Sequence, residues 1–131
     1  MKKFNRYISA WHQRKEENQN RTIASAEKAQ LIAKECAVTL HEDFSVRRVF
    51  LFGSLAEGFF KMNSDIDLVV EGLSNRDYFK ALCKVHHIAD GFDVDILPLE
   101  DYPYKNEVFK KGILFDDKRK KWKNYPPDFT H

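Results

Sequence analysis

The sequence predicts a single α+β domain of two layers, in which a small mixed sheet is flanked by helices. No Gly or Pro occurs before Gly53, which favours long helices over the first forty or so residues. Beyond that point, three short apolar stretches, at 47–52, 65–71 and 92–97, have the composition and alternation of strands. A helical pattern at 75–89 separates the second strand from the third and brings the third strand back to the sheet.

The N-terminal extension is predicted to be helical over residues 1–44. The polar segment 16–20 is either a break or the solvated middle of one long helix, and we interpret it as a break between two helices. The first apolar stripe is Phe4, Tyr7, Ile8 and Trp11, and the second is Ile23, Ala26, Ala29 or Gln30, Ala33, Cys36 or Ala37, and Leu40.

The first strand, at 47–52, is almost wholly apolar at its end, as expected of a strand that is covered on both faces. A turn at Gly53, a short helix at 55–58 and a loop follow it. The second strand then runs from 65 to 71 and stops at Gly72.

The helix after the second strand can be capped by Ser74 or Asn75, and Gly91 lies just past its end. The spacing of its apolar residues predicts a buried face. This face consists of Phe79, Leu82, Val85 and Ala89.

The C-terminal part begins with a loop between Pro98 and Pro103. A short helix at 106–111 and a short edge strand at 112–116 are expected next. Residues 117–131 are expected to form a poorly ordered basic tail.

Two segments carry the residue types of a nucleotide site. A glycine at position 53, where the first apolar run stops, lets the backbone approach a ligand, and the amides at Gly53 and Ser54 can receive phosphate oxygens. In the second strand, Asp65 and Asp67 share one face because successive strand side chains alternate. Since Mg²⁺ is commonly held by one or two carboxylates plus substrate phosphates, the two segments together indicate a nucleotide with its metal.

These segments carry a resemblance to a known family. The patterns Gly53-Ser54-x-Ala56-x-Gly58 and Ser64-Asp65-x-Asp67-Leu68 resemble the signature of the DNA polymerase β-like nucleotidyltransferase superfamily, and most closely its smallest branch, the minimal nucleotidyltransferases. Val94-Asp95-Ile96-Leu97 is similar to the family's third carboxylate strand, and Val108 to Phe115 resembles the branch's closing Ile-x-x-x-Gly-x-x-Leu-Tyr pattern.

The resemblance implies a catalytic core over residues 46–116 with the polymerase β-like fold. It also implies the metal ligands of two Mg²⁺ ions. Asp65 and Asp67 would hold the metals, and Asp95 would complete the second metal site and help to deprotonate the acceptor. Metal ions about 3.5 to 4 Å apart can stabilise both the entering and the departing oxygens of an in-line displacement.

The implied reaction is a transfer of AMP from ATP to a hydroxyl group, in which Gly53 and Ser54 would hold the β and γ phosphates. Proteins of this branch commonly pair with a HEPN-domain partner. There the transferase acts as an antitoxin by modifying a tyrosine on the ribonuclease toxin. The resemblance therefore implies an antitoxin that is a protein adenylyltransferase with a HEPN partner.

One departure from the family pattern keeps other functions open. Many relatives carry Arg where this chain has Leu55, and often a basic residue where it has Glu57. Without a cation beside the triphosphate, a non-catalytic binding module that masks a HEPN partner is an alternative. A transferase for a small molecule such as an aminoglycoside is another, and it would need a second subunit.

Composition limits the class of protein. The 131 residues are 43% hydrophobic and 32% charged, which is ordinary for one soluble globular domain. No apolar run approaches the roughly 18 residues of a membrane span, so the cytoplasm is the expected location. The net charge of +2 is too small to argue for direct nucleic-acid binding. The sequence leaves the oligomeric state open, a homo-oligomer included.

The remaining candidate residues are given structural roles. Cys36 and Cys83 lack the Cys-x-x-Cys spacing of zinc or redox sites and are expected to be buried free thiols. His86 and His87 are expected to be solvated or partly packed, and the basic run 118–123 to be a solvated tail.

Overall fold

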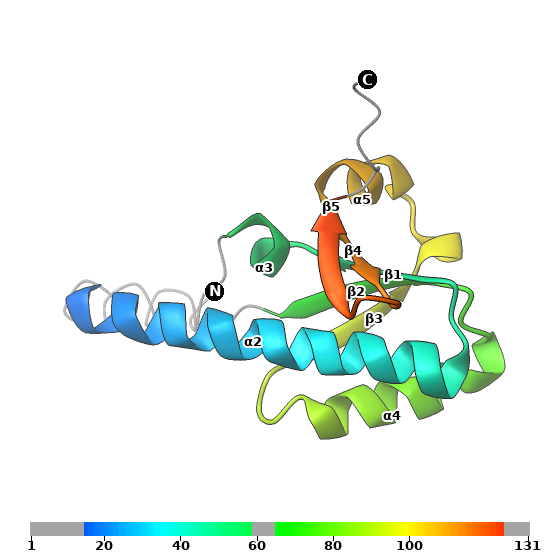
Figure 1. Ribbon diagram of the computed structural model, residues 1–131, viewed down its shortest axis with the longest axis horizontal. Helices are drawn as coiled ribbons and strands as arrows, with labels where there is room; N and C mark the ends of the chain where they lie inside the picture. Colours follow the sequence, from blue (N-terminus) through cyan, green and yellow to red (C-terminus); the bar gives the residue numbers. More distant parts are fainter. Residues whose placement is uncertain (1–14, 59–64, 125–131) are drawn as a thin grey trace, which may run out of the picture.

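The computed structural model describes residues 15–58 and 65–124. Within these ranges helices alternate with the strands of one sheet (Figure 1). The elements are α2 (Lys15–Phe44), β1 (Arg48–Phe52), α3 (Ser54–Glu57), β2 (Ile66–Glu71), the 3-10 turn η1 (Asn75–Asp77), α4 (Tyr78–Ile88), β3 (Val94–Pro98), the 3-10 turn η2 (Leu99–Asp101), α5 (Lys105–Lys111), β4 (Ile113–Asp116) and β5 (Lys121–Asn124).

The strands form one five-stranded mixed sheet in the order β3-β2-β1-β4-β5. β1 pairs antiparallel with both β2 and β4, and β5 pairs antiparallel with β4. β2 and β3 are parallel. A parallel pair needs a crossover connection, which η1 and α4 provide. The mixed sheet with helices on its faces confirms the predicted α+β fold.

Helices cover both faces of the sheet. α2 and α4 lie side by side against one face, where the larger core cluster joins them to the strands, and α5 lies against the other face (Figure 1). The smaller cluster on the α5 face is formed by Phe50, Val69, Leu99 and Val108. Because β1 is covered on both faces, Val49, Phe50 and Leu51 are fully buried, as the apolar run predicts.

Helix α2 is continuous through the polar segment 16–20, so the predicted break there is wrong. The segment contains no Gly or Pro, and Glu and Gln are good helix formers, so the helix can continue through it without local strain. The predicted first stripe at Phe4 to Trp11 lies outside the described residues. The second stripe is confirmed from Ala29 onward: Ala29, Ala33, Cys36, Ala37 and Leu40 are fully buried. No helix within the described ranges is long and apolar enough to cross a membrane.

The buried face of α4 differs from the prediction at its first residue. Ala81, Val85 and Ala89 are buried, but the Phe79 side chain is 75% exposed. Tyr78 takes the inward position instead, since it packs against the larger cluster and its hydroxyl donates a hydrogen bond to the Ile96 carbonyl at 2.9 Å. An apolar pattern cannot predict this choice because both residues are aromatic.

The C-terminal segment folds further than predicted. Residues 121–124 form β5, so β4 is an inner strand and the prediction of an edge strand at 112–116 is wrong. The expectation of a poorly ordered tail is likewise wrong for residues 117–124, whereas residues 125–131 lie outside the described part. Trp122 explains the pairing, because its ring packs edge-on against Phe115 with centroids 5.0 Å apart.

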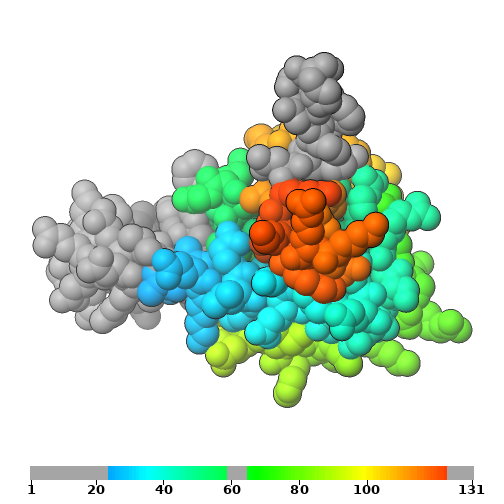
Figure 2. Space-filling view, in the orientation of Figure 1, coloured from blue at the N-terminus to red at the C-terminus, as the bar shows by residue number. Residues whose placement is uncertain are grey.

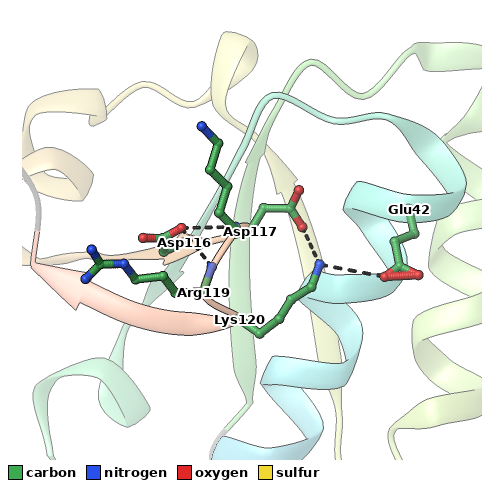
Figure 3. Close-up of polar contacts among 6 residues, drawn as sticks. Glu42, Asp116, Asp117, Arg119 and Lys120 are labelled. Carbon is green, nitrogen blue, oxygen red and sulfur yellow. Dashed lines mark hydrogen bonds and ion pairs between the residues drawn. The ribbon is translucent and has the colours of Figure 1, made fainter.

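The turn between β4 and β5 is held by polar contacts (Figure 3). Asp116 Oδ1 accepts hydrogen bonds from the backbone N–H groups of Lys118 at 3.0 Å and Arg119 at 3.2 Å. Lys120 Nζ lies 2.8 Å from Asp117 Oδ1 and 3.7 Å from Glu42 Oε2 of α2. Figure 2 shows the hairpin, in orange to red, beside the C-terminal part of α2, in cyan. The run 118–123 is therefore partly structural.

Candidate active site

Three carboxylates meet where β2 and β3 begin. Asp67 of β2 and Asp95 of β3 are register partners in the parallel pair, and Asp65 immediately precedes β2. One carboxylate oxygen of each residue lies within 4.8 Å of those of the other two. Asp67 is half-buried, and the other two are exposed. The structure thus brings together all three acidic residues that the sequence analysis selected.

The alternation of each strand explains why these side chains share a face. Ile66 and Leu68 are fully buried in the cluster beneath α2 and α4, which directs Asp65 and Asp67 to the opposite face. Val94 and Ile96 of β3 are buried in the same cluster, so the Asp95 side chain between them points to the opposite face of the sheet. In each strand, core packing against the helices fixes the direction of the acid.

Two of the acids, Asp65 and Asp67, have raised pKa values. Burial raises the pKa of Asp67 to about 6, and the charges of Asp95 and Asp65 add to the rise. Asp65 is exposed, but the burial that it does have is the largest cause that raises its pKa. The charges of Asp95 and Asp93 are the smaller causes. Like charges held this close favour a bound cation or a proton.

This donor set fits Mg²⁺. Carboxylate oxygens are the hard ligands that Mg²⁺ prefers, and one or two carboxylates plus substrate oxygens are its usual protein environment. The separation of up to 4.8 Å between ligand oxygens allows them to share cations. A bound cation would also offset both causes of the raised pKa of Asp67, which are burial and, to a smaller extent, the charges of Asp95 and Asp65.

Gly53 lies directly against the carboxylate cluster. Its φ of +84° is rare for residues with a side chain, and a Cβ at this position would lie 2.8 Å from Asp67 Oδ2. Both the backbone conformation and the space therefore require glycine. Gly53 is also the N-cap residue of α3, and Ser54 is the first helical residue, not the cap. Gly53 thus lies beside the acids, and the binding of phosphates by Gly53 and Ser54 stays a prediction.

Leu55 faces the core. Its side chain is 4% exposed and belongs to the cluster beneath α2 and α4. It anchors the short helix α3 and leaves no cation at this position. Leu55, which departs from the family pattern, is thus a packing residue in this chain.

Sequence reasoning missed an aromatic row on the same face. Phe52 is the register partner of Asp67 on β1, and its ring meets Tyr102 edge-on with centroids 6.1 Å apart. Tyr102 meets Tyr104 at 6.1 Å, and Tyr104 is 64% exposed. The row runs from beside the carboxylates to the surface. No sequence motif indicates it, because Phe52 is 50 residues before Tyr102 in the chain.

The other candidate residues lie away from this cluster or serve the fold. Cys36 is buried, and burial, with the charge of Glu35 as the smaller cause, raises its thiol pKa to about 12. Cys83 is exposed, so the expectation that both thiols are buried is wrong for it. His86 and His87 are both exposed, and His86 is also bonded to the backbone of β3.

Comparisons with known proteins agree with this arrangement. Residues 34–121 match the family model described as Polymerase beta, Nucleotidyltransferase. No curated protein matches the chain. A crystal structure of a toxin-antitoxin with AMP-PNP is 26% identical, with a TM-score of 0.52, over 62% of this chain and 70% of that chain. A Sulfolobus solfataricus protein assigned as a nucleotidyltransferase is 25% identical, with a TM-score of 0.50, over 77% and 91%.

A mutant of the toxin-antitoxin MntA-HpeT is 23% identical over 62% of this chain and 70% of that chain, with a TM-score of 0.50, a likeness of fold alone. The family match covers more than half of this sequence and includes both strands of the carboxylate site, β2 and β3. This chain therefore belongs to the polymerase β nucleotidyltransferase family.

Proposed function

We propose that this chain is a Mg²⁺-dependent nucleotidyltransferase of the cytoplasm that transfers AMP from ATP to a protein hydroxyl. The observation that carries the proposal is the convergence of Asp65, Asp67 and Asp95 within 4.8 Å, beside a glycine whose lack of a side chain the site requires. Hard oxygen ligands next to an open backbone turn suit a metal-bound triphosphate.

Each residue has a defined task in this reaction. Asp65 and Asp67 would hold the metal ions, and Asp95 would complete the second site and help to take the proton of the acceptor hydroxyl. The backbone of Gly53 and the hydroxyl of Ser54 would hold the β and γ phosphates. Bound Mg²⁺ would supply charge stabilisation for the phosphate oxygens and lower the pKa of the acceptor.

The bond changes balance without a further reactant. The acceptor oxygen forms a bond to the α-phosphorus of ATP, the bond from that phosphorus to the bridging oxygen breaks, and pyrophosphate leaves with the electron pair. The acceptor proton passes toward Asp95 and then to solvent. Protein groups mainly position and neutralise, as is usual in phosphoryl-type transfers.

Two further features support an adenine donor and a toxin partner. The toxin-antitoxin that is 26% identical was solved with AMP-PNP, an analogue of ATP. The sequence patterns at 53–58 and 64–68 resemble those of minimal nucleotidyltransferases. We infer that the acceptor is a tyrosine of a HEPN ribonuclease, and that this chain acts as its antitoxin.

The test is transfer of label from ATP. The purified chain, a candidate HEPN partner and α-labelled ATP are incubated with Mg²⁺, and the partner should become labelled. Asp65→Asn with Asp67→Asn is expected to lower the rate by at least about 100-fold. Asp90→Asn is the matched control, since Asp90 is exposed and pairs only at the surface with Lys28 at 3.0 Å. Undiminished labelling by the double variant would exclude the proposed mechanism.

A non-catalytic masking function is the second candidate, and the buried Leu55 favours it. The chain places an apolar anchor where many relatives carry a cation for the triphosphate. Under this alternative, the double Asn variant would still protect cells from the partner, and no modified tyrosine would be found on the partner by mass spectrometry.

A further inference from the structure

Two side chains of α4 are bonded to the backbone of β3 on either side of Asp95. The Tyr78 hydroxyl donates to the carbonyl oxygen of Ile96 at 2.9 Å, and His86 Nε2 donates to that of Val94 at 3.0 Å. Tyr78 begins the helix, and His86 lies just over two turns later. A residue near each end of α4 is therefore hydrogen-bonded to β3.

These carbonyls lie on the outer edge of the sheet. β3 is the terminal strand, and its inner side is bonded to β2, where the Ile66 N–H donates to the Asp93 carbonyl at 2.8 Å. Successive carbonyls of a strand point to opposite sides, so those of Val94 and Ile96 point away from β2. At an open sheet edge such groups have no strand partner. Here the side chains of α4 take the place of a neighbouring strand.

We propose that Tyr78 and His86 are positioning residues for Asp95 in the carboxylate site. The Asp95 side chain is exposed, so packing around it does little to place it, and its position follows from the backbone on which it stands. That backbone is held on one side by the pairing with Asp67 and its neighbours, and on the other by the two bonds from α4. The inference rests on the proposed function of the site.

The distance between the carboxylate oxygens of Asp95 and Asp67 must stay nearly constant for metal binding. Shared metal coordination requires the Asp95 oxygen to stay within a few tenths of an ångström of its place relative to Asp67, since catalytic groups must be held within about 0.5 Å of productive geometry. A terminal strand bonded on one side only is free to move at its other side. Bonds at the residues before and after Asp95 restrain the peptide groups that carry it. Partners that bond directly to a metal ligand affect metal affinity about 10- to 100-fold, so bonds to the neighbouring peptide groups are expected to act at the lower end of this range.

A purely structural role gives a different result from a positioning role. If the two bonds only protect an open sheet edge, their loss lowers the melting temperature and leaves the affinity for a metal ion unchanged. If they position Asp95, their loss weakens metal binding in protein that is still folded. The measurement must therefore follow metal affinity and stability separately.

The test uses the full chain with Mn²⁺ as the probe, measured by calorimetry without nucleotide. Tyr78→Phe removes only a hydroxyl, and His86→Leu removes the ring donor; each is expected to weaken Mn²⁺ binding about tenfold. His86→Gln, whose amide can donate to the same carbonyl, should restore affinity to within about twofold of wild type. His87→Leu, the same change at the neighbouring exposed histidine, is the control and should not alter the Mn²⁺ affinity. Wild-type Mn²⁺ affinity in both Tyr78→Phe and His86→Leu would overturn the inference.

Amide hydrogen exchange in metal-free buffer provides an independent readout. Exchange at residues 95–97 should rise about tenfold in Tyr78→Phe and in His86→Leu, while residues 49–51 of β1 keep wild-type rates. Equal changes in both strands would show a global loss of stability and would also overturn the inference. If wild-type protein bound no Mn²⁺ at all, the proposed function would fail, and the exchange rates would still decide whether the two bonds hold β3.

Discussion

Gly53 and Asp67 lie so close that a Cβ at residue 53 would be 2.8 Å from the Asp67 Oδ2 atom. Residue 53 also has a φ of +84°, a conformation that L side chains rarely adopt. One glycine therefore meets two requirements at once, a backbone with positive φ and room for a carboxylate. This relationship makes the glycine turn and the acidic strand parts of one site.

Replacing Gly53 with alanine is expected to damage both stability and the site. Backbone strain should lower the free energy of unfolding by about 1 to 2 kcal/mol, and the contact with Asp67 should displace the carboxylate and lower the transfer rate by at least about tenfold. The checks are denaturant unfolding and the labelling assay.

Gly91→Ala separates the two effects. Gly91 has a φ of +92°, but a Cβ there would meet no atom within 4 Å. This variant should lose stability through strain alone and keep its transfer activity. If Gly53→Ala matched Gly91→Ala in both unfolding free energy and transfer rate, the close approach of Gly53 to Asp67 would not matter for activity.

The pH dependence of stability is expected to reflect Asp67. Its pKa is raised to about 6 in the folded chain, above the ordinary value of 3.8, so the folded state favours the protonated acid. Below about pH 4 the group is protonated in both states and carries no penalty. As pH rises toward 6, the unfolded state releases its proton first, and folded stability falls until the penalty is complete above pH 6.

Asp67→Asn should remove this penalty. In metal-free buffer containing EDTA, the variant is expected to melt about 2 to 5 °C above wild type at pH 7.5 and at the same temperature as wild type at pH 4. Differential scanning calorimetry at the two pH values provides the comparison. A variant that is less stable than wild type at pH 7.5 would contradict the predicted penalty for ionised Asp67, which comes from burial first and from the neighbouring charges second.

Addition of metal and nucleotide is expected to reverse the repulsion. A ligand that binds only the folded state at 100 times its dissociation constant stabilises by about 2.7 kcal/mol, so saturating Mg²⁺ with AMP-PNP should raise the melting temperature by about 5 °C or more. EDTA should abolish the rise. Asp65→Asn should show little of this rise in melting temperature. A full rise in that variant would mean that the nucleotide binds away from the carboxylate site.

Local patterns in the sequence predict the site well because its geometry is mostly local. The alternation in β2 puts Asp65 and Asp67 on one face, and the same alternation in β3 directs Asp95. Their meeting depends on the parallel register of two strands, and this register follows from a crossover helix whose apolar pattern is visible in the sequence. The residue resemblance adds the third acid, which spacing alone does not select.

Features that depend on distant residues escaped prediction. The strand at 121–124 is short and basic, and only its contact between Trp122 and Phe115 on the neighbouring strand shows why it pairs. The choice of Tyr78 over Phe79 as the inward residue depends on a carbonyl of β3. The aromatic row from Phe52 to Tyr104 needs the fold to bring residues 50 apart in the chain together.

An ion pair at the other end of β1 and β2 is expected to stabilise the register that the site needs. Arg48 and Glu71 are register partners, joined by two hydrogen bonds, from Nε at 2.7 Å and from a terminal guanidinium nitrogen at 2.9 Å. The bond from Arg48 is the largest cause that holds the pKa of Glu71 below its ordinary value. Its stabilisation is therefore present above the unfolded pKa of about 4.5 and is lost as pH falls through the folded value.

Glu71→Gln should test this pair. The variant is expected to lose about 1 to 2 kcal/mol of unfolding free energy at pH 7, because a bidentate, partly buried ion pair stabilises the fold more than an exposed ion pair does. At pH 3 the difference from wild type should shrink. Glu107→Gln is the matched control, since the i,i+4 pair of Glu107 with Lys111 at 3.3 Å is exposed. Equal losses in both variants at pH 7 would contradict the argument.

Removal of residues 117–131 is expected to destabilise the sheet and to promote aggregation. The truncation removes β5 and leaves the backbone groups of β4 at an open edge, which can pair with another chain. It also uncovers Phe115, now 3% exposed, by removing the Trp122 ring. Trp122→Ala in the full chain keeps the strand and removes the ring alone, so it should lower stability by about 2 to 4 kcal/mol without the aggregation. Light scattering and thermal unfolding of the two proteins distinguish the effect of the open β4 edge from the effect of losing the Trp122 ring. Equal aggregation of both proteins would show that the loss of the ring, and not the open edge, causes the aggregation.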